Sequence, residues 1–293
     1  MENLILIKLG GSLITDKKKD KSIKMNVLKQ LCVEISEAQK IIRAKIIIGN
    51  GGGSYSHPPS KKYNISAGYQ NKKSLEGISE VQDLGSQLNR IVVREFINNG
   101  IPAISLNPSS CVITKNSQIT SFFLQPLFHA LDIGMMPVVY GDVIFDSEIG
   151  CSDISTEKIF NYLALNLKEY LKVRKIVYCG LTDGVYDDEG NVIRRITNNS
   201  FKRFSDNIGP SEGIDTTGGM LHKVKEALVL AEQGVDSVII KGSKKGNLYN
   251  LLTKKSYFGT LVTNEKQTAN LKISDESKHV NTSNYKALLL NLD

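Results

Sequence analysis

The chain has 293 residues, of which 41% are hydrophobic and 23% charged, and its formal net charge at pH 7 is +7. This balance is typical of a globular protein and excludes a wholly disordered chain, a collagen and a disulfide-stapled miniprotein. No apolar run approaches the roughly 20 residues that span a bilayer. Glu2 stands where a signal peptide carries bases, so the sequence predicts a cytoplasmic protein with no membrane partner.

The basic residues occur in small clusters spread along the chain. Such a charge balance attracts nucleic acid, anionic membranes or phosphorylated small molecules. The chain has no tryptophan, no RNP-like aromatic motif and no zinc-finger spacing, so we expect no nucleic-acid partner. The lysines are expected to be solvated or to serve a phosphorylated ligand. The four cysteines are scattered, which favours buried core positions over a metal site.

Short apolar runs alternate with segments of helical periodicity. Taken in chain order, strands are predicted over 4–8, 45–48, 102–106, 136–140, 175–179 and 236–241, and helices over 25–42, 81–96, 155–171 and 220–233. Segments 141–150 and 187–191 are predicted to be hairpins or turns. This alternation predicts an α/β fold with a mostly parallel sheet covered by helices on both faces. Ligands of such sheets bind beyond the carboxyl ends of the strands.

Three glycine-rich segments lie where the chain leaves a strand or enters a helix. They are Lys8-Leu9-Gly10-Gly11-Ser12, Gly49-Asn50-Gly51-Gly52-Gly53 and Asp215-Thr216-Thr217-Gly218-Gly219. Glycine lets main-chain N–H groups approach a ligand, and successive N–H groups form a nest for anions. A lysine lies within a few residues of each segment, so the three segments together predict a phosphate site. The P-loop motif is absent, and the dinucleotide fingerprint is poor.

In this order the segments resemble the amino acid kinase family. The other matching motifs are Asp16-Lys17, His57, Asn107-Pro108-Ser109-Ser110, Gly141 to Asp146, Asp183-Gly184-Val185-Tyr186, and Met220 with Lys223. The resemblance covers about residues 3 to 262. It implies an open three-layer αβα sandwich with a mostly parallel central sheet, which binds ATP and Mg²⁺ and forms a homodimer. It places an acceptor-binding half at about 1–170, a nucleotide-binding half at about 171–265 and a polar tail at 266–293.

His57 implies the branch of this family that phosphorylates phosphate or phosphonate groups. The expected activity is ATP-dependent transfer of the γ-phosphoryl group to a phosphate monoester. Isopentenyl phosphate, giving isopentenyl diphosphate, is the favoured acceptor. One alternative is a kinase for a phosphonate such as fosfomycin. Another is a nucleotide-binding regulator with weakened catalysis.

The resemblance also assigns roles to single residues. The catalytic residues would be Lys8, Lys17 and His57. The ATP-binding residues would be Lys8, Gly10, Gly11, Ser12, Gly53, Asp183, Gly219 and Lys223. The acceptor-binding residues would be Gly52, Gly53, His57 and Thr156. No residue is assigned to a protein-bound metal.

Three positions depart from the family pattern. Ser56 replaces a glycine, Thr156-Glu157 replaces a Gly-Asp pair, and Leu181 replaces an acidic residue. The family glycine offers its main chain to the acceptor, so Thr156 is expected to narrow or re-aim the acceptor pocket.

Several charged residues are left without a firm role. Asp142, Asp146 and Asp153 could orient Mg²⁺ or lysines, or could equally cap turns. Lys24 and Lys29 are expected to be solvated, and His222 is expected to lie on a helix surface.

Overall fold

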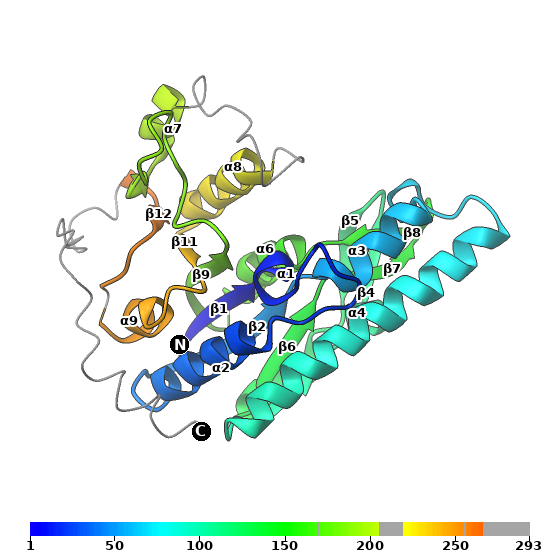
Figure 1. Ribbon diagram of the computed structural model, residues 1–293, viewed down its shortest axis with the longest axis horizontal. Helices are drawn as coiled ribbons and strands as arrows, with labels where there is room; N and C mark the ends of the chain where they lie inside the picture. Colours follow the sequence, from blue (N-terminus) through cyan, green and yellow to red (C-terminus); the bar gives the residue numbers. More distant parts are fainter. Residues whose placement is uncertain (169, 205–218, 255, 266–293) are drawn as a thin grey trace.

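The computed structural model describes residues 1–168, 170–204, 219–254 and 256–265. Within these residues one sheet has eight strands in the order β10-β12-β11-β9-β1-β2-β6-β3, and a second has four in the order β5-β4-β7-β8 (Figure 1). The third glycine segment up to Gly218 and the tail 266–293 lie outside the described residues, so the predictions made for them stay predictions.

The strands are β1 (Asn3–Leu9), β2 (Ala44–Asn50), β3 (Ala103–Ser105), β4 (Val112–Lys115), β5 (Gln118–Phe122), β6 (Met136–Tyr140), β7 (Asp142–Asp146), β8 (Gly150–Ile154), β9 (Lys172–Gly180), β10 (Arg195–Ile196), β11 (Asp236–Lys241) and β12 (Thr260–Val262). The helices are α1 (Gly11–Ile14), α2 (Met25–Gln39), α3 (Gly53–Lys62), α4 (Lys72–Asn98), α5 (Gln125–Asp132), α6 (Thr156–Asn166), α7 (Asn198–Phe204), α8 (Gly219–Glu232) and α9 (Asn247–Thr253).

The large sheet is mostly parallel, as predicted. Strand β1 pairs in parallel with β2 and β9, β2 with β6, and β9 with β11, whereas β12 runs antiparallel to β11. Side chains alternate along a strand, so Ile5 and Ile7 of β1 belong to the core on one face while Leu4 and Leu6 belong to the core on the other.

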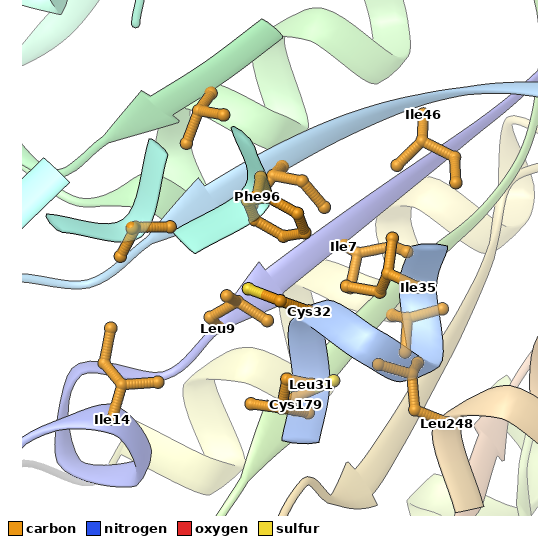
Figure 2. Close-up of a cluster of buried hydrophobic side chains, with 14 of the residues drawn as sticks. Ile7, Leu9, Ile14, Leu31, Cys32, Ile35, Ile46, Phe96, Cys179 and Leu248 are labelled. Atoms are coloured by element: carbon orange, nitrogen blue, oxygen red, sulfur yellow. The ribbon is translucent and has the colours of Figure 1, made fainter. Parts of the chain in front are cut away.

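Helices cover both faces of this sheet. On one face, buried side chains of α2, α4 and α9 pack against β1 and β2, and Figure 2 shows Leu31, Ile35, Phe96 and Leu248 gathered around Ile7. On the other face, buried side chains of α5, α6 and α8 form a second core. The three-layer αβα architecture predicted from the resemblance is therefore confirmed.

The small sheet was only partly anticipated. Strands β7 and β8 form the predicted hairpin, and β4 and β5 extend it. In Figure 1 this sheet lies beside α3 and the first half of α4, at the end of the molecule away from α7 and α8. A third apolar cluster, Ile65, Val81, Val143 and Cys151, lies between α4 and the hairpin. This end of the molecule therefore has its own small core.

Some element bounds differ from the prediction. The helices predicted to end at 42 and 171 end at Gln39 and Asn166. Strand β2 continues through Gly49 because the missing Cβ leaves room for Thr156 and Phe160. Helix α3 was missed because it contains Pro58 and Pro59, which normally interrupt a helix.

The cysteines behave as core side chains rather than ligands. Cys32, Cys151 and Cys179 are buried, Cys111 is half-buried, and all four are free thiols. Among the residues described, no helix combines the length and apolarity needed to cross a bilayer.

Candidate active site

The loops that follow the parallel strands meet at one edge of the large sheet. Each loop begins with a glycine amide that donates to the end of a neighbouring strand. Gly10 donates to Cys179 O at 2.9 Å, and Gly51 donates to Leu9 O at 3.0 Å. Gly242 does the same toward Gly180 O at 2.9 Å. Parallel strands bring their carboxyl ends to this edge, so the first two glycine segments meet there, whereas the third lies outside the described residues up to Gly218.

The first two glycine segments touch through their main chains. A Cβ on Gly11 would overlap the amide nitrogen of Gly53, and a Cβ on Gly51 would lie 2.8 Å from the nitrogen of Gly11. Thr15 links the same two segments, because its hydroxyl donates to Gly11 O at 2.7 Å and accepts from the amide of Ser54 at 3.0 Å. Glycine is required here because no side chain fits between the two loops.

Three helices begin at this edge. Helix α3 starts at Gly53, whose φ of 52° is in the left-handed region that favours glycine. Helix α6 starts at Thr156 and helix α8 at Gly219. Free N–H groups and the helix dipole make helix N-termini favourable places for anions. The edge can therefore hold more than one negatively charged group.

Two lysines from opposite halves of the chain meet at Glu157. Lys8, near the end of β1, forms a hydrogen-bonded ion pair with Glu157 on the first turn of α6. Lys223 of α8 places its Nζ 3.9 Å from Glu157 Oε1. Burial alone would raise the pKa of this carboxyl, but the charges of Lys8 and then Lys223 outweigh it and hold the pKa below its usual value. Glu157 is therefore ionised and orients both lysines.

His57 lies on α3, close to the same charges. Desolvation lowers its pKa, as do the charges of Lys17 and Lys8, while Asp153 and Glu157 act in the opposite direction. The imidazole is therefore neutral at pH 7 and can donate one hydrogen bond. Lys17 is exposed, and its ammonium group is near enough to influence His57 electrostatically.

Asp183 follows β9 on the nucleotide-side half. Its carboxylate lies 3.8 Å from Lys241 Nζ and accepts a hydrogen bond from the Tyr186 hydroxyl at 3.3 Å. Ser12 belongs to α1, and its carbonyl accepts from Lys24 Nζ at 3.0 Å. The expectation that Lys24 is solvated was therefore wrong, because the side chain folds back onto the first glycine segment.

Thr156 occupies the edge in an unexpected way. The side chain is buried, and its hydroxyl donates to the carbonyl of Asn50 at 2.7 Å. Its methyl group lies over Gly49. The hydroxyl is thus bonded to the main chain of β2, which leaves only the main chain of Thr156 to contact an acceptor. That contact stays a prediction.

The three aspartates of uncertain role are engaged in local structure. Asp146 accepts from four main-chain amides, those of Asn116, Ser117, Glu148 and Ile149. Asp142 accepts from the amides of Ser109 and Val143. Asp153 accepts from the Ser60 hydroxyl at 2.5 Å. Turn capping therefore accounts for the hydrogen bonds of Asp146. The hydrogen bonds of Asp142 are likewise made to main-chain amides.

Two residues that the structure places centrally were not assigned a role from the sequence. Glu157 stands out only as a departure from the family pattern, although it is the carboxylate between Lys8 and Lys223. Thr15 directly precedes the Asp16-Lys17 motif, which was its only signal. His222 lies on the helix surface as predicted, beside Glu226.

A comparison of the sequence with protein-family models identifies the family of this chain. The amino acid kinase family model matches residues 3–242. The chain belongs to the amino acid kinase family. As a member of that family it is a phosphotransferase, as the resemblance predicted. The glycine segments and lysines at the carboxyl edge lie within the matched residues.

Within the amino acid kinase family, the chain is similar to proteins named isopentenyl phosphate kinase. The protein of that name from Methanothermobacter thermautotrophicus is 31% identical over 89% of this chain and 99% of its own length. That from Methanocaldococcus jannaschii is 32% identical over 85% and 95%. A solved structure of an isopentenyl phosphate kinase superposes with a TM-score of 0.74 at 29% identity, covering 88% of this chain and 99% of the other.

Proposed function

We propose that this phosphotransferase transfers the γ-phosphoryl group of ATP to isopentenyl phosphate and so produces isopentenyl diphosphate. The observation that carries the proposal is the main-chain contact between the two glycine segments, beside the ion-paired lysines. The contact sets two anion-binding loops side by side, as a reaction between two phosphorylated substrates requires. The names of the similar proteins supply the acceptor.

The acceptor needs no general base. The second pKa of a phosphate monoester is about 6, so at neutral pH its oxygen is already an anionic nucleophile. The barrier comes mainly from bringing two polyanions together, and phosphoryl transfer is catalysed mostly by positioning and charge stabilisation. Lys8, the first residue of the first glycine segment, is paired with Glu157 and is assigned to the transferred group. The exposed Lys17 has no ion pair among the described contacts and is assigned to charge that develops in the transition state.

On the nucleotide side, the phosphates of ATP would lie along Gly10, Gly11 and Ser12. The donor phosphate would approach Gly53, where the two glycine segments touch. Lys223 and Gly219 at the start of α8, with Asp183 after β9, would complete this side. Gly10 packs closely against the end of β9, because a Cβ on Gly10 would lie only 2.9 Å from Cys179 O.

On the acceptor side, the phosphate monoester would lie at the N-terminus of α3. The amides of Gly52 and Gly53 would face it, and the neutral imidazole of His57 would donate one hydrogen bond to it. The apolar cluster of Ile65, Val81, Val143 and Cys151 is fully buried, so it supports the fold of this half and does not contact the acceptor. The choice of an alkyl phosphate over a phosphonate rests on the names of the similar proteins.

Magnesium would arrive with the nucleotide. The described residues contain no group of three or more His, Cys, Asp or Glu side chains suited to a metal ion. Mg²⁺ is commonly held by substrate phosphates and water with few protein ligands, so no side chain of this chain is assigned to it. When bound, the ion would neutralise charge on the phosphates, while the lysines hold and orient them.

The test is nucleotide consumption against a panel of acceptors. Formation of ADP is measured with isopentenyl phosphate, dimethylallyl phosphate, other monophosphates and fosfomycin. The product isopentenyl diphosphate is identified by mass spectrometry. The proposal expects kcat/KM to be highest for isopentenyl phosphate. A higher value for fosfomycin would replace it with a phosphonate kinase, and no turnover of any acceptor would contradict catalysis of this kind.

A further inference from the structure

A chain of polar side chains runs through the interior beside the acceptor-side glycine segment. Asn89, in the middle of α4, donates its amide Nδ2 to Asn50 Oδ1 at 2.9 Å. Ser105 Oγ, at the end of β3, lies 2.5 Å from Asn89 Oδ1 and 2.9 Å from Asn107 Oδ1. One hydroxyl donates only once, so one of the two amides turns its nitrogen toward Ser105. The chain joins Asn50, Asn89, Ser105 and Asn107.

Burying the polar side chain of Asn89 in an apolar core costs free energy. The side chain is fully buried, and its helix neighbours Leu88, Val92 and Val93 belong to the main apolar core. A buried amide costs free energy unless its hydrogen bonds are made, whereas an apolar side chain of similar size would not. A polar residue here therefore contributes orientation rather than core stability.

Asn50 depends on this single contact. Its side chain is 1% exposed, and its Nδ2 atom has no hydrogen-bond partner among the described residues. Asn89 is thus the side chain that fixes the Asn50 amide. The carbonyl of Asn50 accepts from the Thr156 hydroxyl at 2.7 Å and from the Gly141 amide at 3.2 Å. Asn50 therefore joins α4, the start of α6 and the end of β6.

The residue that follows Asn50 is the first glycine of the acceptor-side segment. A rotation of Asn50 would be passed through Gly51 to Gly52 and Gly53, and the amides of Gly52 and Gly53 are assigned to the acceptor phosphate. Asn89 and Ser105 lie on α4 and β3, on the acceptor-side half. Neither belongs to the elements assigned to the nucleotide, which are the end of β1, α1, α8 and the loop after β9, with Gly53 shared by the two substrates.

We propose that Asn89 is a positioning residue, which acts through Asn50 to hold the acceptor-side glycine segment in its phosphate-binding conformation. Ser105 and Asn107 hold Asn89 in turn. This inference rests on the proposed function, because it assigns the segment after Asn50 to the acceptor. It predicts an effect on acceptor binding that exceeds any effect on ATP binding.

The main variant is Asn89→Leu, which keeps the size and removes the hydrogen bonds. We expect KM for isopentenyl phosphate to rise about tenfold, while KM for ATP changes less than about twofold, because small misplacements of a positioned group weaken catalysis strongly. Ser105→Ala should show a smaller rise of the same kind. Ser105→Thr keeps the hydroxyl and should restore KM to near the wild-type value.

The control is Val92→Ala, a cavity in the same helix and the same core that leaves the polar chain intact. It should lower the melting temperature at least as much as Asn89→Leu does and leave both KM values unchanged. An unchanged acceptor KM in Asn89→Leu would overturn the inference. So would an equal rise in Val92→Ala, or the failure of Ser105→Thr to differ from Ser105→Ala. If Asn89→Leu does not fold, the Ser105 pair decides.

Calorimetric binding of isopentenyl phosphate provides a readout that needs no turnover. Weaker binding by Asn89→Leu than by Val92→Ala supports the inference, and equal binding overturns it. Absence of turnover by the wild-type protein with bound isopentenyl phosphate would contradict the proposed function alone. The two failures are therefore distinguishable.

Discussion

The acceptor-side glycine segment and the lysine cluster around Glu157 build the same edge of the sheet by different means. The glycine segment is held by main-chain contacts, by the Thr15 hydroxyl and by the buried amide of Asn89. The lysine cluster is held by charge, with Lys8 and Lys223 on either side of Glu157. The first region fixes positions through shape, and the second gathers positive charge, which the proposed reaction between two phosphates would need.

This contrast has a consequence for mutations. A change in the glycine segment should disturb structure and catalysis together, because main-chain atoms of two loops share one space. A change to an exposed cation should disturb catalysis alone. Variants of Lys17, Gly11 and His57 test that contrast, and variants of Asp142 and Asp146 test the small sheet outside it.

Lys17→Ala should have the largest effect on turnover. Loss of one group that stabilises transition-state charge lowers kcat by about 10² to 10³, or about 2.7–4 kcal/mol of barrier. Lys17 is exposed, so the free energy of unfolding should change by less than about 0.5 kcal/mol. Lys18→Ala, the exposed neighbour, is the matched control and should retain wild-type kcat. Near-normal turnover of Lys17→Ala would remove Lys17 from the mechanism.

Gly11→Ala should damage both properties. The new methyl group would overlap the main chain of Gly53, so we expect a loss of about 1–3 kcal/mol in unfolding free energy and about a hundredfold loss in kcat/KM. Gly180→Ala is the steric control at the same edge, because its Cβ would meet nothing within 4 Å. If both variants lost activity equally, the close contact between the loops would not be the cause.

His57→Gln should have a moderate effect that is confined to the acceptor. We expect KM for isopentenyl phosphate to rise about tenfold, the cost of one weakened hydrogen bond to a charged group. Desolvation and the nearby lysines lower the pKa of His57, so we expect the pH dependence near pH 6 to follow the second ionisation of the acceptor rather than the titration of His57. Activity should therefore rise through pH 6 in both proteins, and His222→Gln should match the wild type. A flat profile in His57→Gln alone would show that His57 titration sets the pH dependence.

Asp142→Asn should change stability rather than turnover, and by the smallest amount. Burial raises the pKa of the Asp142 carboxyl from 3.8 to about 6 despite hydrogen bonds from Ser109 and Val143. The folded protein therefore binds a proton that the unfolded chain has released, and this stabilisation is lost as pH rises through 6. Between pH 5 and pH 7 the unfolding free energy of Asp142→Asn should gain about 1 kcal/mol relative to wild type.

Asp146 is the control, because its pKa is shifted in the opposite direction to that of Asp142. Burial acts to raise the pKa of Asp146, but the main-chain amides of Ser117, Glu148 and Ile149 outweigh it and hold the pKa well below its usual value. Its stabilisation is therefore present above the unfolded pKa and is lost as pH falls. Asp146→Asn should be destabilised at neutral pH, and chemical denaturation across pH distinguishes the two variants. The same sign for both would contradict this account of their environments.

The sequence alone determined the α/β class, most elements of the large sheet and the meeting of the two glycine segments that the structure describes. The continuous apolar run from Leu4 to Ile7 is typical of a strand buried on both faces, and glycines after a strand mark close approach of main chains. These patterns depend on the conformation and burial of neighbouring residues in the chain, so they can be recognised from a short stretch of sequence. The element bounds failed where a partner from elsewhere intervened, as at Gly49, which Thr156 and Phe160 cover.

Only the tertiary structure decided which side chains meet at the edge. Lys8 and Glu157 are 149 positions apart, and Asn50 and Asn89 are 39 apart. Their contacts depend on the strand order β9-β1-β2-β6 and on the register that aligns Leu9 with Asn50. No local pattern encodes that order, because it results from packing two helical layers on one sheet. The residues that position the chemistry therefore became visible only in the folded chain.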